Sequence, residues 1–149
     1  MRNSFKNAFR GIIICLKSER NMRIHAAVAV YVIIAAAAAK IPAFEWLAVI
    51  LCVGLVIMAE MLNTGLEKLC DVIEKKYSKE IGAIKDIAAG AVLVLSAASA
   101  VVGGLIFFRA ERIENILDFA RKNIPIAALV IVSVPVVAYF VFKGYKEKK

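Results

Sequence analysis

The chain has 149 residues, of which 62% are apolar, and it carries 20 Lys and Arg against 12 Asp and Glu, a formal net charge of +8. A soluble domain of this size could not bury so large an apolar fraction, and a disordered chain or a disulfide scaffold needs a different composition. We therefore expect a small all-α integral membrane protein, whose basic excess indicates cytoplasmic loops and anionic lipid headgroups rather than nucleic acid.

The first segment, residues 1–23, is predicted to be a basic amphipathic helix that lies on the membrane surface. Its apolar residues recur at helical spacing and its basic residues lie mostly between them: Phe5, Ala8, Phe9, Ile12 and Leu16 against Arg2, Lys6, Arg10, Lys17 and Arg20. A signal peptide is not expected, because the apolar run 11–16 is too short and no small-residue cleavage site follows it.

Four apolar segments are candidates for membrane spans, which need about 20 apolar residues. They begin near Ile24, Phe44, Ile87 and Ile124 and end near residues 39, 66, 108 and 142. Lys and Arg are frequent before the first span, between the second and third, and in the tail after the fourth. Positive residues mark cytoplasmic segments, so these three segments are predicted to face the cytoplasm. Segment 109–122 also holds four Lys and Arg and is ambiguous by this rule, and the even number of spans places it outside.

An unusual set of polar residues follows the apolar run of the second span. Glu60, Asn63, Glu67 and Asp71 are spaced by three and four residues, which places them on one face of a helix. Glu60 lies about two turns, or roughly 10 Å, deeper than Glu67. A carboxylate at this depth indicates function, although hydrogen bonds that hold helices in register are an alternative. Clustered carboxylates at a membrane edge suit Mg²⁺ that is shared with substrate phosphates.

Two other segments bring charged residues to the same side of the membrane. Glu19 precedes the first span, and Lys85-Asp86 opens the third, where the lysine could hold a phosphate as a point charge. His25, the single histidine, is interpreted as an interfacial or packed residue. The motifs of P-loop enzymes, dinucleotide-binding enzymes, protein kinases, zinc sites and serine hydrolases do not occur.

These residues resemble the motifs of the bacterial integral-membrane diacylglycerol kinase/undecaprenol kinase family. The similarity covers about residues 5–108 and consists of Phe9-Arg10-Gly11, the run Glu19-Arg20-Asn21-Met22-Arg23-Ile24-His25, Glu45-Trp46, the Glu60 to Asp71 series, and Lys85-Asp86 followed by Ala88-Ala89-Gly90-Ala91-Val92. The run at 19–25 and Glu45-Trp46 look more like the undecaprenol kinase branch.

The resemblance implies a role for each matching residue. Glu60 would be the catalytic base, Glu19 and Glu67 would hold Mg²⁺, and the ATP site would include these two together with Lys85 and Asp86. The supporting residues of the site would be Asn63, Asp71, Arg10 and Arg23. The family also implies a homotrimer with sites shared between subunits.

Three features depart from the family pattern. Gly65-Leu66 replaces a commoner Ala-Ile pair, and segment 75–79 lacks a histidine that often contacts adenine. The fourth span lies outside the three-span pattern, so we divide the chain into a lipid kinase domain at 1–108 and a linker, extra span and basic tail at 109–149.

The expected function is ATP-dependent phosphorylation of a membrane lipid alcohol, with undecaprenol favoured over diacylglycerol as the acceptor. The active site would face the cytoplasm at a bacterial plasma membrane. A proton-coupled four-span transporter is the alternative from another class, and it would need its carboxylate near the bilayer centre rather than at one edge. A structural membrane subunit is the third alternative.

Overall fold

The chain folds into a helical membrane bundle in a computed structural model, which describes residues 2–73 and 78–143 and the side chains from Ser4 onward. The elements of the described part are all helices: α1 (Arg2–Ser18), α2 (Arg20–Ala39), α3 (Ala43–Ile73), α4 (Lys79–Phe107), α5 (Ala110–Lys122) and α6 (Ile124–Lys143). Four of them, α2, α3, α4 and α6, are long and apolar enough to cross a membrane. The predicted all-α integral membrane fold with a fourth C-terminal span is therefore confirmed.

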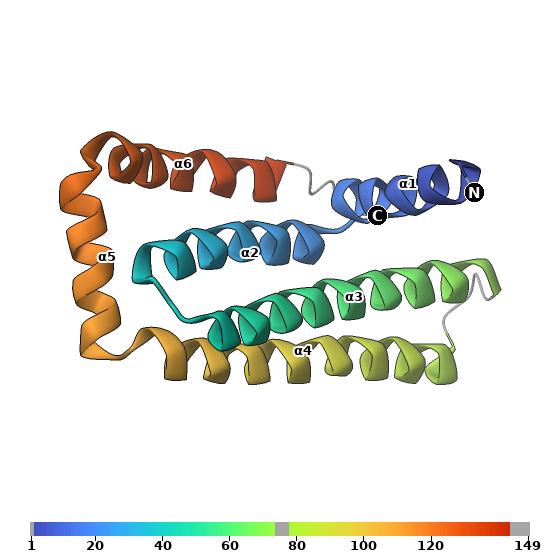
Figure 1. Ribbon diagram of the computed structural model, residues 1–149. Coiled ribbons are helices and arrows are strands. Elements are labelled where there is room, and N and C mark those ends of the chain that lie inside the picture. The colour runs from blue at the N-terminus through green and yellow to red at the C-terminus, as the bar shows by residue number, and fades with distance from the viewer. Residues whose placement is uncertain (1, 74–77, 144–149) are drawn as a thin grey trace.

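The spans lie side by side with one helix across one end (Figure 1). In this view α2 lies between α6 and α3, and α4 lies beyond α3. Helix α5 crosses the end that contains the α2–α3 turn, which we call the α5 end. Helix α1 lies at the opposite end, the α1 end, together with the C-terminal part of α3 and the start of α4.

The helices differ in length, which gives the bundle two unequal ends. Helices α2 and α6 have 20 residues each, about 30 Å, which matches the hydrocarbon thickness of a bilayer. Helix α3 has 31 residues and α4 has 29, about 46 and 43 Å at the same rise. Helix α2 ends, α3 begins and α4 ends near the α5 end. Because α3 and α4 are longer, they extend about three turns past α2 at the α1 end.

Helix α1 has the composition that the sequence predicts, but its axis differs in direction from that of a helix lying across the ends of the spans. Phe5 and Phe9 are exposed, as a membrane-facing apolar side would be, whereas Cys15 is buried. The chain turns at Glu19, whose backbone is extended, and α2 starts at the next residue. The axis of α1 continues along the direction of the spans in Figure 1 instead of crossing their ends, so its attachment to the membrane surface stays a prediction.

A cluster of buried apolar residues lies at the α5 end, where α2, α3 and α4 approach one another. Its buried members are Ala36, Ala39, Ile41, Val49 and Ile106. Trp46 is partly buried against this cluster.

The segment between the third and fourth spans was expected to be a linker, but it is helix α5. Its side chains satisfy carbonyl groups that the end of α2 leaves without helical partners. Asn115 donates from Nδ2 to the Ala39 carbonyl oxygen at 3.2 Å, and Arg112 donates to the Lys40 carbonyl oxygen at 3.3 Å. Lys40 itself adopts the left-handed conformation, with φ of 53°, that commonly ends a helix. Helix α5 thus caps α2.

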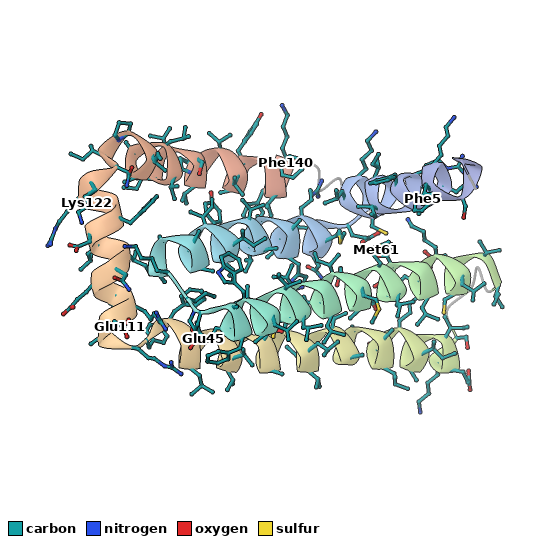
Figure 2. The ribbon with its side chains drawn as sticks, viewed as in Figure 1. Phe5, Glu45, Met61, Glu111, Lys122 and Phe140 are labelled. Atoms are coloured by element: carbon teal, nitrogen blue, oxygen red, sulfur yellow. The ribbon has the colours of Figure 1, made fainter. Side chains whose placement is uncertain are left out.

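A buried ion cluster also fixes α5 to the start of α3. Glu45 is 3% exposed, and Figure 2 shows it at the α5 end of the bundle. Its Oε1 lies 2.9 Å from a guanidinium nitrogen of Arg109, and its Oε2 lies 3.6 Å from one of Arg112, which is 8% exposed. Sequence reasoning noted Glu45 only as part of a motif, because its partners are more than 60 residues away along the chain.

The Arg112→Ala variant is expected to lower the free energy of unfolding by about 3 kcal/mol, because it leaves Glu45 buried with one of its two cations. Thermal denaturation in detergent or nanodiscs measures this loss. Arg121→Ala is the matched control, since Arg121 is an exposed residue of the same helix whose pair with Asp118 contributes about 0.5 kcal/mol or less. Equal melting temperatures for the two variants would contradict the role assigned to the cluster.

Helix α6 packs against α2 through two contacts between side chains. The hydroxyl groups of Tyr31 and Ser133 lie 2.9 Å apart, and the Arg23 guanidinium lies 5.9 Å from the centre of the Phe140 ring. Figure 2 labels Phe140 on the part of α6 that approaches the start of α2. The Ser133 hydroxyl thus gives Tyr31 a hydrogen-bonding partner inside the bundle, and the Phe140 ring lies beside the buried guanidinium of Arg23.

Candidate active site

The predicted site residues come from three segments that reach the same depth of the bundle. At 1.5 Å per residue, and counted along each helix from the α5 end, the distances are about 26, 30, 33 and 36 Å for Glu60, Glu19, Lys85 and Glu67. Glu60 therefore falls just inside the edge of a 30 Å hydrocarbon layer, and the other three fall at or beyond it. The helix lengths alone therefore place the acids and the lysine in one thin layer near the α1 end.

The polar face of α3 changes gradually from buried to exposed. Glu60 is 2% exposed and Asn63 is also buried, whereas Glu67 is half-buried and Asp71 is exposed. Asn63 donates from Nδ2 to Glu67 Oε1 at 3.1 Å, one helical turn away. The buried end of this face is the part nearest the membrane interior, as the spacing in the sequence predicts.

Glu60 keeps an acceptor atom without a partner. Its Oε2 and the Oδ1 of Asn63 are both buried and make no hydrogen bond in the described part of the chain. Thr64 does not supply one, because its hydroxyl donates to the backbone oxygen of Glu60 at 2.9 Å. Buried polar atoms are normally hydrogen-bonded, so these two mark a place where a polar group of another molecule fits.

The structure also places Glu19 beside the polar face of α3. Its Oε1 lies 3.9 Å from the Nζ of Lys68, which follows Glu67 on α3. The carboxylates of Glu67 and Glu19 both act electrostatically on Glu60. Among the described residues no three His, Cys, Asp or Glu side chains are close enough to hold a metal ion by themselves. The oxygen donors present therefore suit an ion such as Mg²⁺ only when phosphate oxygens complete its coordination.

Lys85 reaches back from α4 to α3. Its Nζ donates to Oδ1 of Asp71 at 2.6 Å, an ion pair between exposed or half-exposed groups. The pair holds the lysine over the exposed end of the polar face of α3. A lysine in this place can act as a point charge for phosphate oxygens.

The remaining predicted residues do not join this group. Arg10 and Asp86 are exposed and make no hydrogen bond or ion pair with another described residue. Arg23 is buried, but its contact is with Phe140 of α6 rather than with the acids. Of the segment 75–79, which the sequence analysis considered for adenine contacts, residues 75–77 lie outside the described part.

A polar pocket of about 340 Å³ opens beside Glu60. Side chains from α2, α3 and α4 line it: Asn21, Ile24, His25, Glu60, Asn63, Ala89, Val92, Leu93 and Ser96. Glu60 and Asn63 of α3 and the first turns of α2 therefore form part of its wall.

An apolar cavity of about 350 Å³ continues from this pocket toward the α5 end. It lies between the same three helices, mostly among Val, Ile and Ala side chains, and Phe107 lines it at the α5 end of α4. Both spaces share Ile24, His25 and Ser96. The arrangement offers a hydrocarbon chain a place within the membrane while its polar end lies beside Glu60.

Sequence reasoning missed several residues of this region. Lys68 and Ser96 carried no signal, because a lysine at a helix end and a serine in a run of small residues are common. Asn21 was noted only as part of the matching run at 19–25. His25 was interpreted as a packed residue, whereas it lines both spaces. A helical projection of α2 could have shown that His25 and Ile24 share a face with Val28 and Val32.

Comparison with known proteins agrees with this geometry. Residues 6–107 match the family model described as prokaryotic diacylglycerol kinase. An undecaprenol kinase of Bacillus subtilis is 39% identical over 104 residues, which cover 70% of this chain and 85% of the relative. A diacylglycerol kinase of Synechocystis sp. is 38% identical over 102 residues, covering 68% of this chain and 58% of the relative.

No solved structure matches the chain significantly. The family match ends where α4 ends, so α5 and α6 lie beyond it. The matched part contains the polar face of α3, Glu19 and Lys85, and therefore every residue that the structure gathers in the layer near the α1 end. The chain belongs to the prokaryotic diacylglycerol kinase family and is a membrane-embedded lipid kinase of that family.

Proposed function

We propose that the chain transfers the γ-phosphoryl group of ATP to the hydroxyl group of a membrane lipid alcohol, with undecaprenol as the favoured acceptor. The observation that supports this most is the position of Glu60. Its carboxylate is buried, one oxygen has no partner among the described residues, and the residue lines the polar pocket that adjoins the apolar cavity. A lipid alcohol can enter this place from the bilayer.

In the proposed reaction, Glu60 accepts the proton of the lipid hydroxyl as the oxygen forms a bond with the γ-phosphorus. The bond between that phosphorus and the bridging oxygen to the β-phosphate breaks, and ADP leaves. Lys85 acts as a positive charge near the phosphates, and Asn63 keeps Glu67 in place through its hydrogen bond. Glu19 and Glu67 complete the nucleotide side of the site.

Mg²⁺ would be held by Glu19 and Glu67 together with phosphate oxygens, and it would neutralise phosphate charge. These two acids fit a metal ion because each has a carboxylate oxygen that can bind it. Oε2 of Glu67 takes no part in the hydrogen bond with Asn63, and Glu19 has only a 3.9 Å contact with Lys68. Two carboxylates and a nearby lysine suit a metal–phosphate complex better than a bare ion.

Undecaprenol is favoured over diacylglycerol because the relative that acts on it by name is matched over 85% of its length, against 58% for the diacylglycerol kinase. The transporter alternative is weaker, since Glu60 lies about 26 Å along α3, near one end of the span rather than at the bilayer centre. We also propose that the α1 end faces the cytoplasm of a bacterial plasma membrane, where ATP is available, and that the chain forms a homotrimer.

Purified protein in nanodiscs, with radiolabelled ATP and Mg²⁺, tests the proposal directly. Labelled lipid phosphate should form with undecaprenol and more slowly with diacylglycerol. Faster labelling of diacylglycerol would reverse the acceptor assignment. ATP-dependent labelling of neither lipid by a folded protein would contradict the kinase proposal itself.

Truncation after Arg121, which removes α6, is expected to preserve most of the specific activity. No residue of α6 lines either space beside Glu60, and α5, with its ion cluster, remains. The loss of the Tyr31–Ser133 and Arg23–Phe140 contacts should instead lower the melting temperature. A truncated protein that is folded yet inactive, or that changes its preferred acceptor, would show that α6 shapes the lipid site.

A further inference from the structure

Helix α5 lies outside both the proposed reaction and the part of the chain that matches the family. It crosses the end of the bundle, where it packs against α2, α4 and α6 (Figure 1). Spanning helices run roughly along the membrane normal, so a helix across their ends lies roughly in the plane of the membrane. Helix α2 ends and α6 begins beside α5, and each matches the hydrocarbon thickness of a bilayer. Helix α5 is therefore at the depth where hydrocarbon meets headgroups.

The side chains of α5 divide into separate sides around its axis. Arg112 is buried and marks the side toward the bundle. Ile113 and Leu117, one turn apart, share a second side, and both are exposed. Glu111 and Asp118 share a third side, which lies roughly 130° around the axis from the second. A helix whose apolar and charged sides are separated in this way is typical of one that lies in the membrane interface.

Exposed apolar residues also flank α5 at both of its ends. Phe108 directly follows α4 and is 84% exposed, and Ile124, the first residue of α6, is 69% exposed. Helices α4 and α6 are spans with largely exposed apolar surfaces, which lipid covers in a membrane. The exposed apolar surface thus continues along the chain from one lipid-facing helix, through α5, to the next. This continuity identifies phospholipid as the partner of α5.

A second copy of the chain suits this side of α5 less well. A stable protein interface needs about 800 Å² from each partner, whereas the exposed large apolar residues of α5 are Ile113 and Leu117. Exposed charges of both signs accompany them. Glu114 and Lys122 make no ion pair with another described residue, and Lys122 lies where α5 meets α6 (Figure 2). Charges of both signs match a zwitterionic headgroup, which carries a phosphate and an ammonium group.

We propose that α5 is an interfacial anchor, whose side formed by Ile113 and Leu117 inserts among the acyl chains of the phospholipids nearest the α5 end. Its exposed charged residues lie among the headgroups. The ion pairs of Glu45 with Arg109 and Arg112 join α5 to the start of α3. The anchor therefore fixes the depth of α3 in the membrane, and this role does not depend on the proposed reaction.

Tryptophan fluorescence of the intact protein in phosphatidylcholine nanodiscs tests this contact. Ile113→Trp is made in a Trp46→Phe background, because Trp46 is the single native tryptophan. The quenchers are phosphatidylcholine brominated near the headgroup end of its acyl chains and iodide in the buffer. Brominated lipid should quench Ile113→Trp at least about twofold more than Asp118→Trp, the matched control on the charged side of α5. Iodide should quench the two variants in the opposite order.

Two results would overturn the proposal. Protection of Ile113→Trp from both quenchers would show that protein covers this side, and iodide quenching equal to that of Asp118→Trp would show that it faces water. Leu117→Trp, one turn further along, gives the same reading if Ile113→Trp does not fold. Should Trp46→Phe fail to fold, Trp46 is retained and the quenching of the wild type is subtracted. None of these readings uses phosphorylation, so the anchor and the proposed function are tested separately.

Discussion

Glu60→Gln is expected to lower the rate of lipid phosphorylation by about a thousandfold while leaving the affinity for Mg-ATP nearly unchanged. The amide has the shape of the carboxylate, so packing among the buried residues of α3 is kept, but it cannot accept the proton of the acceptor hydroxyl. The two acids assigned to the nucleotide side, Glu19 and Glu67, come from other positions and stay intact. Turnover with undecaprenol and binding of a fluorescent ATP analogue separate the two effects.

Glu114→Gln provides the control for this substitution, because Glu114 is an exposed acid of α5 at the opposite end of the bundle. Its turnover should equal that of the wild type. A Glu60→Gln enzyme with near-normal turnover would remove Glu60 from the role of base. Loss of nucleotide binding together with turnover would place Glu60 on the ATP side of the site instead.

Glu67→Ala and Glu19→Ala are each expected to raise the Mg²⁺ concentration for half-maximal activity by about tenfold or more. Each substitution removes one of the two carboxylates proposed to hold the ion. The effect should be larger for Glu67, since Asn63 holds its side chain in place, than for Glu19, which has the longer contact with Lys68.

Mg²⁺ titrations at saturating lipid measure this requirement for each variant. Lys68→Ala helps to interpret Glu19: if Lys68 only pairs with Glu19, its removal should leave the Mg²⁺ requirement within about twofold of the wild type. An active Glu19→Ala enzyme with an unchanged Mg²⁺ requirement would exclude Glu19 from the metal site.

The periodicity of the sequence was sufficient to predict the features of the structure that depend on a single helix. Apolar stretches of about 20 residues predicted the spans, and three- and four-residue spacing predicted that Glu60 and Glu67 share a face of α3. The predicted orientation of the spans placed Glu19 and Lys85 on the same side of the membrane as that face. Each of these inferences uses only helix geometry and the thickness of a bilayer.

Features that depend on two distant segments could not be predicted in the same way. The segment of α5 was expected to be a linker because it lies between the third and fourth spans, beyond the part that resembles the family. Its charged side chains find their partners only in the fold, at Glu45 and at the open carbonyl groups at the end of α2. The exposure of Arg10 and the contact of Arg23 with Phe140 also depend on packing. No local pattern distinguishes a histidine that lines a cavity from one that fills a core, which is why the position of His25 was not foreseen.

The Glu45 cluster also has a consequence for how the chain is made. Ribosomes deliver Glu45 to the membrane about 60 residues before Arg109 and Arg112, so a nascent chain that has inserted its first two spans carries an acid whose cations do not yet exist. Because domains form as their segments emerge, the bundle stays incompletely locked until α5 has been translated. A chain that ends before α5 therefore lacks both cations of Glu45, and we expect it to be less stable and more susceptible to membrane proteases than the finished protein.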